Sequence, residues 1–213
     1  MKITIVYDNE TQRKELKPDW GFSCIVDVEG RRILFDTGAN GSILLGNMEK
    51  IGVNPTSLDE IFISHDHWDH TGALADVLRA RGGKIKVYVP ASFSSVPGAG
   101  EFVKVGPALE IHQNIYSTGE LKNIEQSMIV KTEKGLVVLT GCSHPGVGEI
   151  LKTATRCGKV SALIGGLHGF REFGLLRTLD IVCPTHCTLY KSEIEALFPE
   201  KFIQDGVGKV IDW

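Results

Sequence analysis

The chain has 213 residues, of which 42% are hydrophobic and 23% charged, with a formal net charge of −3. This length allows one sizeable core or at most two small domains, and the composition is that of a globular protein. The small negative charge gives no reason to expect a nucleic-acid partner, and no apolar run is long enough to span a bilayer, so we expect no membrane partner.

Cysteine usage and the N-terminus indicate the compartment. Five cysteines, an odd number, are scattered along the chain, which argues for a reducing environment and against a disulfide framework. The opening stretch "MKITIVYDNE" becomes polar within ten residues, unlike a signal peptide. We therefore expect a cytoplasmic protein.

Strand and helix patterns alternate along the first half of the chain. Apolar and polar residues alternate as in strands, and Glu29-Gly30 between two β-rich runs is typical of a hairpin turn. Two stretches have the apolar spacing of helices and end on glycine. We predict strands over 2–7, 22–28, 31–38, 60–64 and 84–89, and helices over 42–52 and 71–83.

The second half begins with a less regular segment. Residues 91–124 contain clusters of Ser, Pro and Gly, which are typical of loops around short strands, and we expect this segment to shape a pocket. Ser192 and Glu195 have the spacing of a capping box at the start of the last helix. No repeat or linker divides the chain, so one domain over 1–213 is the simplest interpretation. We predict strands over 127–132, 135–141, 160–166, 179–186 and 209–213, and helices over 147–158 and 192–198.

Candidate ligands stand just after the carboxyl ends of the predicted strands. Strand ends at one edge of a sheet converge in space, and open α/β folds build their sites there. Loops held by such a scaffold commonly carry the chemistry. The residues in these positions are Asp36, His65, Cys142, His144, His168 and His186.

The densest group of ligands lies in residues 63–72, "ISHDHWDHTG". His65 and His67 are two apart, so in an extended segment both side chains project to one side and can bind one ion. Asp69 and His70 stand where the chain turns into the next helix, and can serve a second ion. Imidazole suits zinc or iron, and Asp adds an oxygen ligand. Two ions about 3.5–4 Å apart could share a water and lower its pKa towards ~7.

Several motifs carry a resemblance to a known family. The segment "HDHWDH" resembles the His-x-His-x-Asp-His motif of the metallo-β-lactamase superfamily, and "ILFDTG" resembles the first motif of that superfamily. The runs "GFSCIVDVEGRRILFDTG", "VVLTGCSHPGV", "IGGLHGF" and "PTHCT" resemble its dihydropterin synthase-like branch. This resemblance implies an α+β fold, a four-layer αββα sandwich of two mixed β-sheets with the site at one edge.

The resemblance also implies roles for single residues. Asp36 would support the metal loop, and His186 would be the last metal-binding histidine, shared by the second ion with Asp69 and His70. Many relatives carry a further His where this chain reads "KNIEQSMIV". We therefore interpret His144 as the residue that completes the first ion's ligands with His65 and His67.

Two positions keep more than one interpretation. Cys142 stands where relatives carry an Asp that bridges the ions, and it either binds metal or packs as a small hydrophobe. His168 lies between glycines, which let the backbone approach a ligand closely. It could bind metal in place of the missing Asp, donate a proton to a leaving group or hold a phosphate.

The remaining polar candidates are given supporting or structural roles. Asp66 either steadies the loop, carries a proton or is a surface carboxylate, and Trp68 is a supporting residue. His112 is interpreted as structural or exposed. Cys183 and Cys187 flank "PTH", but a zinc knuckle needs four ligands, so both are interpreted as packed thiols.

These patterns predict a metal-dependent hydrolase that uses metal-activated water on a phosphoester, lactone or thioester-type small molecule. It would hold one or two divalent ions, zinc first and iron or manganese as alternatives, with Asp69 or His168 moving the proton. One alternative is a transferase that displaces pyrophosphate with an aryl amine, as the branch resemblance implies. Others are a di-iron redox enzyme on the same fold, whose relatives usually carry extra carboxylates, and a binding protein without metal. Nothing in the sequence indicates the oligomeric state.

Overall fold

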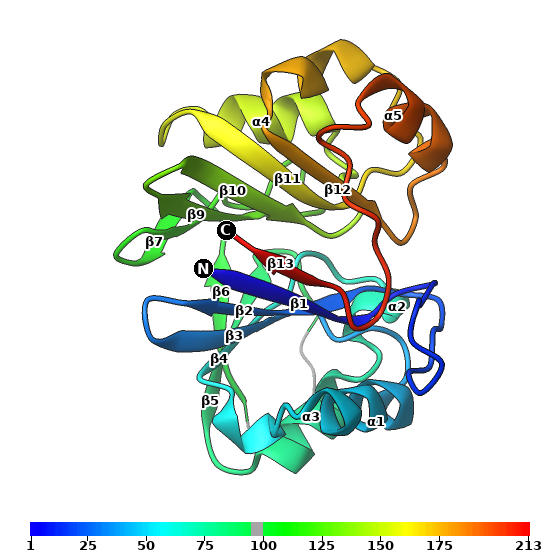
Figure 1. Ribbon diagram of the computed structural model, residues 1–213. Helices are drawn as coiled ribbons and strands as arrows, with labels where there is room; N and C mark the ends of the chain where they lie inside the picture. Colours follow the sequence, from blue (N-terminus) through cyan, green and yellow to red (C-terminus); the bar gives the residue numbers. More distant parts are fainter. Residues whose placement is uncertain (95–99) are drawn as a thin grey trace.

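Two mixed β-sheets pack face to face, and helices cover their outer faces (Figure 1). The computed structural model describes residues 1–94 and 100–213, so residues 95–99 of the segment expected to shape a pocket lie outside the described residues. The four layers confirm the αββα sandwich that the resemblance implies.

The first sheet contains seven strands within the described ranges, in the order β13-β1-β2-β3-β4-β5-β6. Its β2–β3 pair is the predicted antiparallel hairpin, whereas β3 to β6 are parallel. The predicted final strand pairs with β1 at one edge. The bounds are β1 Lys2–Tyr7, β2 Ser23–Val28, β3 Arg31–Phe35, β4 Glu60–Phe62, β5 Ile85–Pro90, β6 Gly100–Val105 and β13 Val210–Asp212.

The second sheet has six strands in the described part of the chain, in the order β12-β11-β10-β9-β8-β7. The predicted strands over 127–132 and 135–141 form the antiparallel pair β9 and β10, and β10, β11 and β12 are parallel. The bounds are β7 Leu109–His112, β8 Ile115–Ser117, β9 Met128–Thr132, β10 Gly135–Thr140, β11 Val160–Gly166 and β12 Ile181–Thr185.

The helices pack on the outer faces of the sheets. Apolar residues of α1 and α3 join those of the first sheet, and apolar residues of α4 and α5 join those of the second. Asn40 caps the start of α1 by accepting hydrogen bonds from the amides of Ser42 and Ile43, and Gly52 ends it with a φ of 84°. The bounds are α1 Gly41–Ile51, α2 Trp68–Thr71, α3 Leu74–Arg81, α4 Val147–Ala154 and α5 Lys191–Leu197, with 3₁₀ turns over Pro55–Ser57 and Phe173–Thr178.

The main core lies between the sheets. In β3, Ile33 and Phe35 face this core while Leu34 faces the helices, because successive side chains of a strand point to opposite faces. Phe35 stacks on Phe62 of β4, with ring centroids 5.4 Å apart. Both faces of these strands are buried, which explains their nearly continuous apolar sequence.

Two local predictions are wrong. The helix predicted over 71–83 is divided into α2, which begins earlier at Trp68, and α3, which begins at Leu74. Ser192 and Glu195 do not form a capping box, because α5 begins at Lys191 and no side chain caps it. Ser192 is thereby placed inside the first turn instead of before it.

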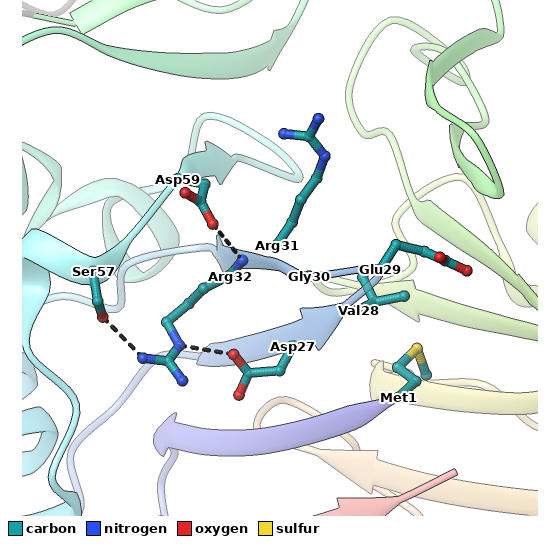
Figure 2. A pocket seen from close by; sticks show the side chains of 9 residues that line it. All are labelled: Met1, Asp27, Val28, Glu29, Gly30, Arg31, Arg32, Ser57 and Asp59. Atoms are coloured by element: carbon teal, nitrogen blue, oxygen red, sulfur yellow. Dashed lines mark hydrogen bonds and ion pairs between the residues drawn. The ribbon is translucent and has the colours of Figure 1, made fainter.

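A pocket of about 470 Å³ lies at the β2–β3 turn. Figure 2 shows the residues that line it. The turn precedes β3, whereas the candidate ligand Asp36 follows the other end of that strand. Arg32 donates to Asp27 Oδ1 at 2.7 Å and to Ser57 Oγ at 2.9 Å, while its backbone amide donates to Asp59. Arg31 extends away from this group (Figure 2). Most charged groups of the pocket are therefore paired with one another. The hydrogen bonds of Arg32 to Ser57 and Asp59 connect β3 to the turn before β4.

His112 has a structural contact, in agreement with its interpretation. Its Nε2 lies 2.8 Å from both carboxylate oxygens of the buried Glu60, so the pair joins β7 of one sheet to β4 of the other. None of the helices that the structure describes is long and apolar enough to cross a membrane.

The stacked phenylalanines give a stability prediction. Phe62→Ala should lower the free energy of unfolding by about 3–5 kcal/mol, because it removes a fully buried ring and leaves a cavity. Urea denaturation measures the change. Leu197→Ala is the matched control: this side chain is 55% exposed on α5, and its loss should change stability by no more than about 0.5 kcal/mol. Equal losses in both variants would contradict this account of the core.

Candidate metal centre

The predicted convergence of strand ends is observed. Parallel pairing aligns the ends of β3 and β4 in one sheet and of β10, β11 and β12 in the other. An isolated bridge between His65 and Glu125 joins the chain after β4 to the chain before β9. Side chains from both sheets therefore meet at one edge of the sandwich, where α2 also lies (Figure 1).

The first donor group consists of three imidazoles. Donor atoms of His65, His67 and His144 lie within 4.8 Å of one another, as the sequence interpretation expected. His65 Nε2 and His67 Nδ1 are 3.0 Å apart. Within the described part of the chain, the buried Nε2 of His144 has no hydrogen-bond partner. A buried nitrogen without a partner is costly unless a ligand that the structure does not contain satisfies it.

The second donor group combines a carboxylate with two imidazoles. Asp69, His70 and His186 place donor atoms within 4.8 Å of one another, again as expected. Asp69 Oδ2 lies 3.2 Å from His186 Nε2 and accepts a hydrogen bond from Trp20 Nε1 at 2.8 Å. No hydrogen bond to His186 Nε2 is formed among the described residues, although this atom is buried.

Cys142 lies between the two groups. Its Sγ is 3.2 Å from His70 Nε2, and it forms one donor group with His65 and His70 and another with His186 and Cys187. This is the position that the resemblance gives to a bridging Asp. Sequence analysis left open whether Cys142 binds metal or packs as a small hydrophobe. Its place in two donor groups makes it a possible metal ligand.

The spacing of these atoms suits a metal ion. Zinc binds nitrogen at about 2.0–2.1 Å and sulfur at about 2.3 Å, so tetrahedral ligand atoms lie roughly 3.3–3.6 Å apart. The contacts between His186 and Asp69 and between His70 and Cys142, both 3.2 Å, are close to that value. Together with the unpartnered nitrogens, they indicate that the site fits one or two ions.

Asp36 supports this centre from behind. Its Oδ2 lies 2.7 Å from His70 Nδ1, and the backbone amide and hydroxyl of Ser64 donate to its two oxygens. Asp36 is absent from the donor groups that the described residues form. These contacts are compatible with the supporting role that the resemblance implies, because Asp36 orients the His70 ring with its other nitrogen, Nε2, towards Cys142.

His186 has a similar support that the sequence did not indicate. Asn9 Oδ1 lies 2.9 Å from His186 Nδ1, and Asn9 Nδ2 donates to the His186 carbonyl oxygen at 3.0 Å. The buried Asp8 accepts from the His186 amide. These residues follow β1, some 180 positions earlier, and "YDNE" has no recognised motif that would have revealed them.

Glu125 is a further residue that sequence analysis missed. Its fully buried carboxylate accepts hydrogen bonds from the backbone amides of Gly141, Cys142, Ser143 and His144 at 2.8–3.1 Å, and from the Thr140 hydroxyl. It thereby fixes the loop after β10. The only signal was an acidic residue before an apolar strand, in the stretch where relatives carry a His.

His168 and Asp66 lie at the rim. His168 is exposed, its ring centroid is 5.0 Å from that of His144, and it belongs to none of the donor groups formed by the described residues. Of its three alternatives, metal binding has the least support. Asp66 accepts from the Ser94 amide at 2.9 Å and so steadies its loop, while Trp68 is 65% exposed.

The cysteines near the last strand differ from one another. Cys183 packs in the core between the sheets, in agreement with its interpretation as a packed thiol. Cys187 instead contacts Cys142 and joins a donor group with it and His186. The closeness of the two thiols lowers the pKa of Cys187 and, together with burial, raises that of Cys142.

The surroundings also shift the pKa values of the histidines. Burial, followed by the neighbouring imidazoles, lowers the pKa of His65 far below its usual range and that of His144 to about 4. Burial would lower the pKa of His70 as well, but Asp36 outweighs it and the net pKa is raised. Neutral imidazole is the form that binds metal, so His65 and His144 are ready to act as ligands at pH 7.

Comparison with known proteins agrees with this geometry. A family model described as "Metallo-beta-lactamase superfamily" matches residues 19–150. The chain belongs to the metallo-beta-lactamase superfamily. One curated relative is the 7,8-dihydropterin-6-methyl-4-(beta-D-ribofuranosyl)-aminobenzene-5'-phosphate synthase of Methanocaldococcus jannaschii. It is 27% identical to this chain, and the match covers 91% of each protein.

Solved structures share the metallo-beta-lactamase fold. Tm1679, described as a metal-dependent hydrolase of the beta-lactamase superfamily, has a TM-score of 0.78 at 24% identity, covering 100% of this chain and 99% of its own. The short form of human tRNase Z has a TM-score of 0.67 at 16% identity, with 100% and 99% covered. At these identities the likeness concerns the fold alone.

Glu125 gives a prediction about the centre. Glu125→Gln should lower the free energy of unfolding by about 1–3 kcal/mol, because an amide NH₂ in place of Oε2 cannot accept the hydrogen bond that the His144 amide now donates to that oxygen. Denaturant unfolding of the metal-free protein measures this loss. Glu133→Gln, at an exposed position, is the control and should change stability by less than about 0.5 kcal/mol. A Glu125→Gln variant as stable as that control would contradict the role of Glu125.

Proposed function

We propose that the protein is a metal-dependent hydrolase that acts on a phosphoester, lactone or thioester-type small molecule. The observation that supports this is the meeting of two donor groups at Cys142, with buried nitrogens of His144 and His186 left without partners among the described residues. An ion held there would polarise a substrate oxygen and lower the pKa of a water molecule. Zinc suits this set of imidazole, carboxylate and thiol ligands best.

The protein's own residues would divide the work. His65, His67 and His144 hold one ion, and Asp69, His70 and His186 hold the other. Asp69 is kept in place by Trp20, so its carboxylate can also accept a proton close to the reacting atoms. His168, at the rim, can donate a proton from its ring nitrogen to the leaving group.

A second candidate function is the transferase. It is favoured by the curated relative that matches over 91% of both chains and is named a synthase. In that reaction an aryl amine would replace water as the nucleophile and pyrophosphate would leave, while the donor groups would do the same work. A di-iron redox role is less favoured, because Asp69 is the single carboxylate in the donor groups that the described residues form.

The metal assignment gives the central prediction. Wild type that is loaded with zinc and then dialysed to remove free metal should retain one or two ions per chain. His65→Ala and His186→Ala should each bind less metal than wild type and have a kcat/KM lower by at least ~100-fold. Elemental analysis and a screen of phosphoesters, lactones and thioesters measure both effects. His112→Gln, outside the centre, is the control and should keep metal and activity. Either alanine variant with full metal and full activity would refute the ligand assignment.

The two candidate functions differ in the nucleophile. A hydrolase should release product from the best substrate of the screen at a rate independent of added aryl amine. A transferase should release pyrophosphate from a pterin diphosphate ester only when the amine is present. Pyrophosphate release measured with and without para-aminobenzoate as the amine separates them, and strict dependence on the amine would replace the hydrolase by the transferase.

A further inference from the structure

Two thiols from different strands meet beside the metal centre. Cys142 follows β10 and Cys187 follows β12, and β11 lies between these two strands. Strands two apart in a sheet are separated by about 9.5 Å, so side chains after them do not normally touch. Here β11 ends at Gly166, where an added Cβ would lie 2.6 Å from Cys187 Sγ and 3.3 Å from Cys142 Cα. The missing side chain is what allows the thiols to approach.

An imidazole completes the group. Donor atoms of Cys142, Cys187 and His186 all lie within 4.8 Å of one another. All three residues are buried, with 3%, 6% and 4% of their surface exposed. His186 Nε2 finds no hydrogen bond in residues 1–94 and 100–213. Unlike Cys183, which is surrounded by apolar side chains between the sheets, these two thiols lie close to His186 Nε2, which is 3.2 Å from Asp69 Oδ2 but forms no hydrogen bond with the described residues.

We propose that Cys142 and Cys187 are both ligands of the ion that His186 binds. This rests on the metal centre proposed above and adds Cys187 to it. Each S–H would lose its proton to solvent as the sulfur–metal bond forms. The ion beside His65, His67 and His144 would then have imidazole ligands, and the ion beside His186 would have two thiolates.

This arrangement predicts which metals the second position accepts. Thiolates favour zinc, cadmium and cobalt over manganese and magnesium, which prefer oxygen ligands. The second position would therefore exclude manganese and magnesium while the first, with three imidazoles, is less selective.

Cobalt provides the test, because sulfur–cobalt bonds absorb in the near ultraviolet whether or not the protein turns over a substrate. Metal-free protein is titrated with Co²⁺, with bound cobalt measured in parallel. Wild type should develop the sulfur-to-cobalt band. Cys187→Ser and Cys142→Ser should each lower it to about half, and the double variant should lack it, because each removes one thiolate. Cys157→Ser, at a half-buried thiol after α4, is the matched control and should keep the full band.

Each other outcome overturns the inference in a defined way. Cobalt bound by wild type without the band would refute thiolate ligation and leave the proposed metal centre standing. No bound cobalt would refute both. A full band in Cys187→Ser would remove Cys187 from the ligands. If that variant does not fold, Cys187→Ala and X-ray absorption of zinc-loaded wild type replace it, and spectra without sulfur at about 2.3 Å would refute the inference.

Discussion

The candidate metal centre depends on one buried carboxylate that holds two distant parts of the chain together. Taking the Glu125 carboxylate out of water is costly unless hydrogen bonds satisfy it. Four backbone amides and a hydroxyl of residues 140–144 do so, and the backbone of Glu125 pairs with His65. The same residue thus fixes the loop that carries Cys142 and His144 relative to the loop that carries His65 and His67.

The same design is repeated around the centre. Asp36 holds the ring of His70, and Asn9 holds the ring of His186. Asp36, Ser143, His168 and His186 also have positive φ angles, between 43° and 59°, which non-glycine residues rarely adopt. Strained backbone persists only where its surroundings enforce it. Four of the eight such non-glycine residues in the described ranges lie in the loops at this edge, where the strained backbone orients their side chains.

The sequence predicted those parts of the site that local patterns encode. The spacing of His65, His67, Asp69 and His70 and the placement of ligands after strands are short-range features, and the structure brings these residues together. Asp8, Asn9 and Glu125 escaped because their partners lie up to 178 positions away and no local pattern marks them. Cys187 was interpreted as a packed thiol, since its proximity to Cys142 depends on the order of three strands and on Gly166 between them. The break after Thr71 falls at Gly72, where an added Cβ would lie 2.3 Å from the carbonyl oxygen of Ala39. This contact with a distant segment was also invisible in the local sequence pattern.

The pairing of β13 with β1 bears on how the molecule forms. Thr4 lies opposite Val210, and the amide of Trp213 donates to the carbonyl oxygen of Met1 at 2.9 Å. This ladder closes a loop of about two hundred residues, so it cannot assemble until everything between has emerged from the ribosome. Contacts of such long range slow the search for the native topology. Until β13 forms, this edge of β1 has no partner strand, and an unpaired strand edge can pair with other chains.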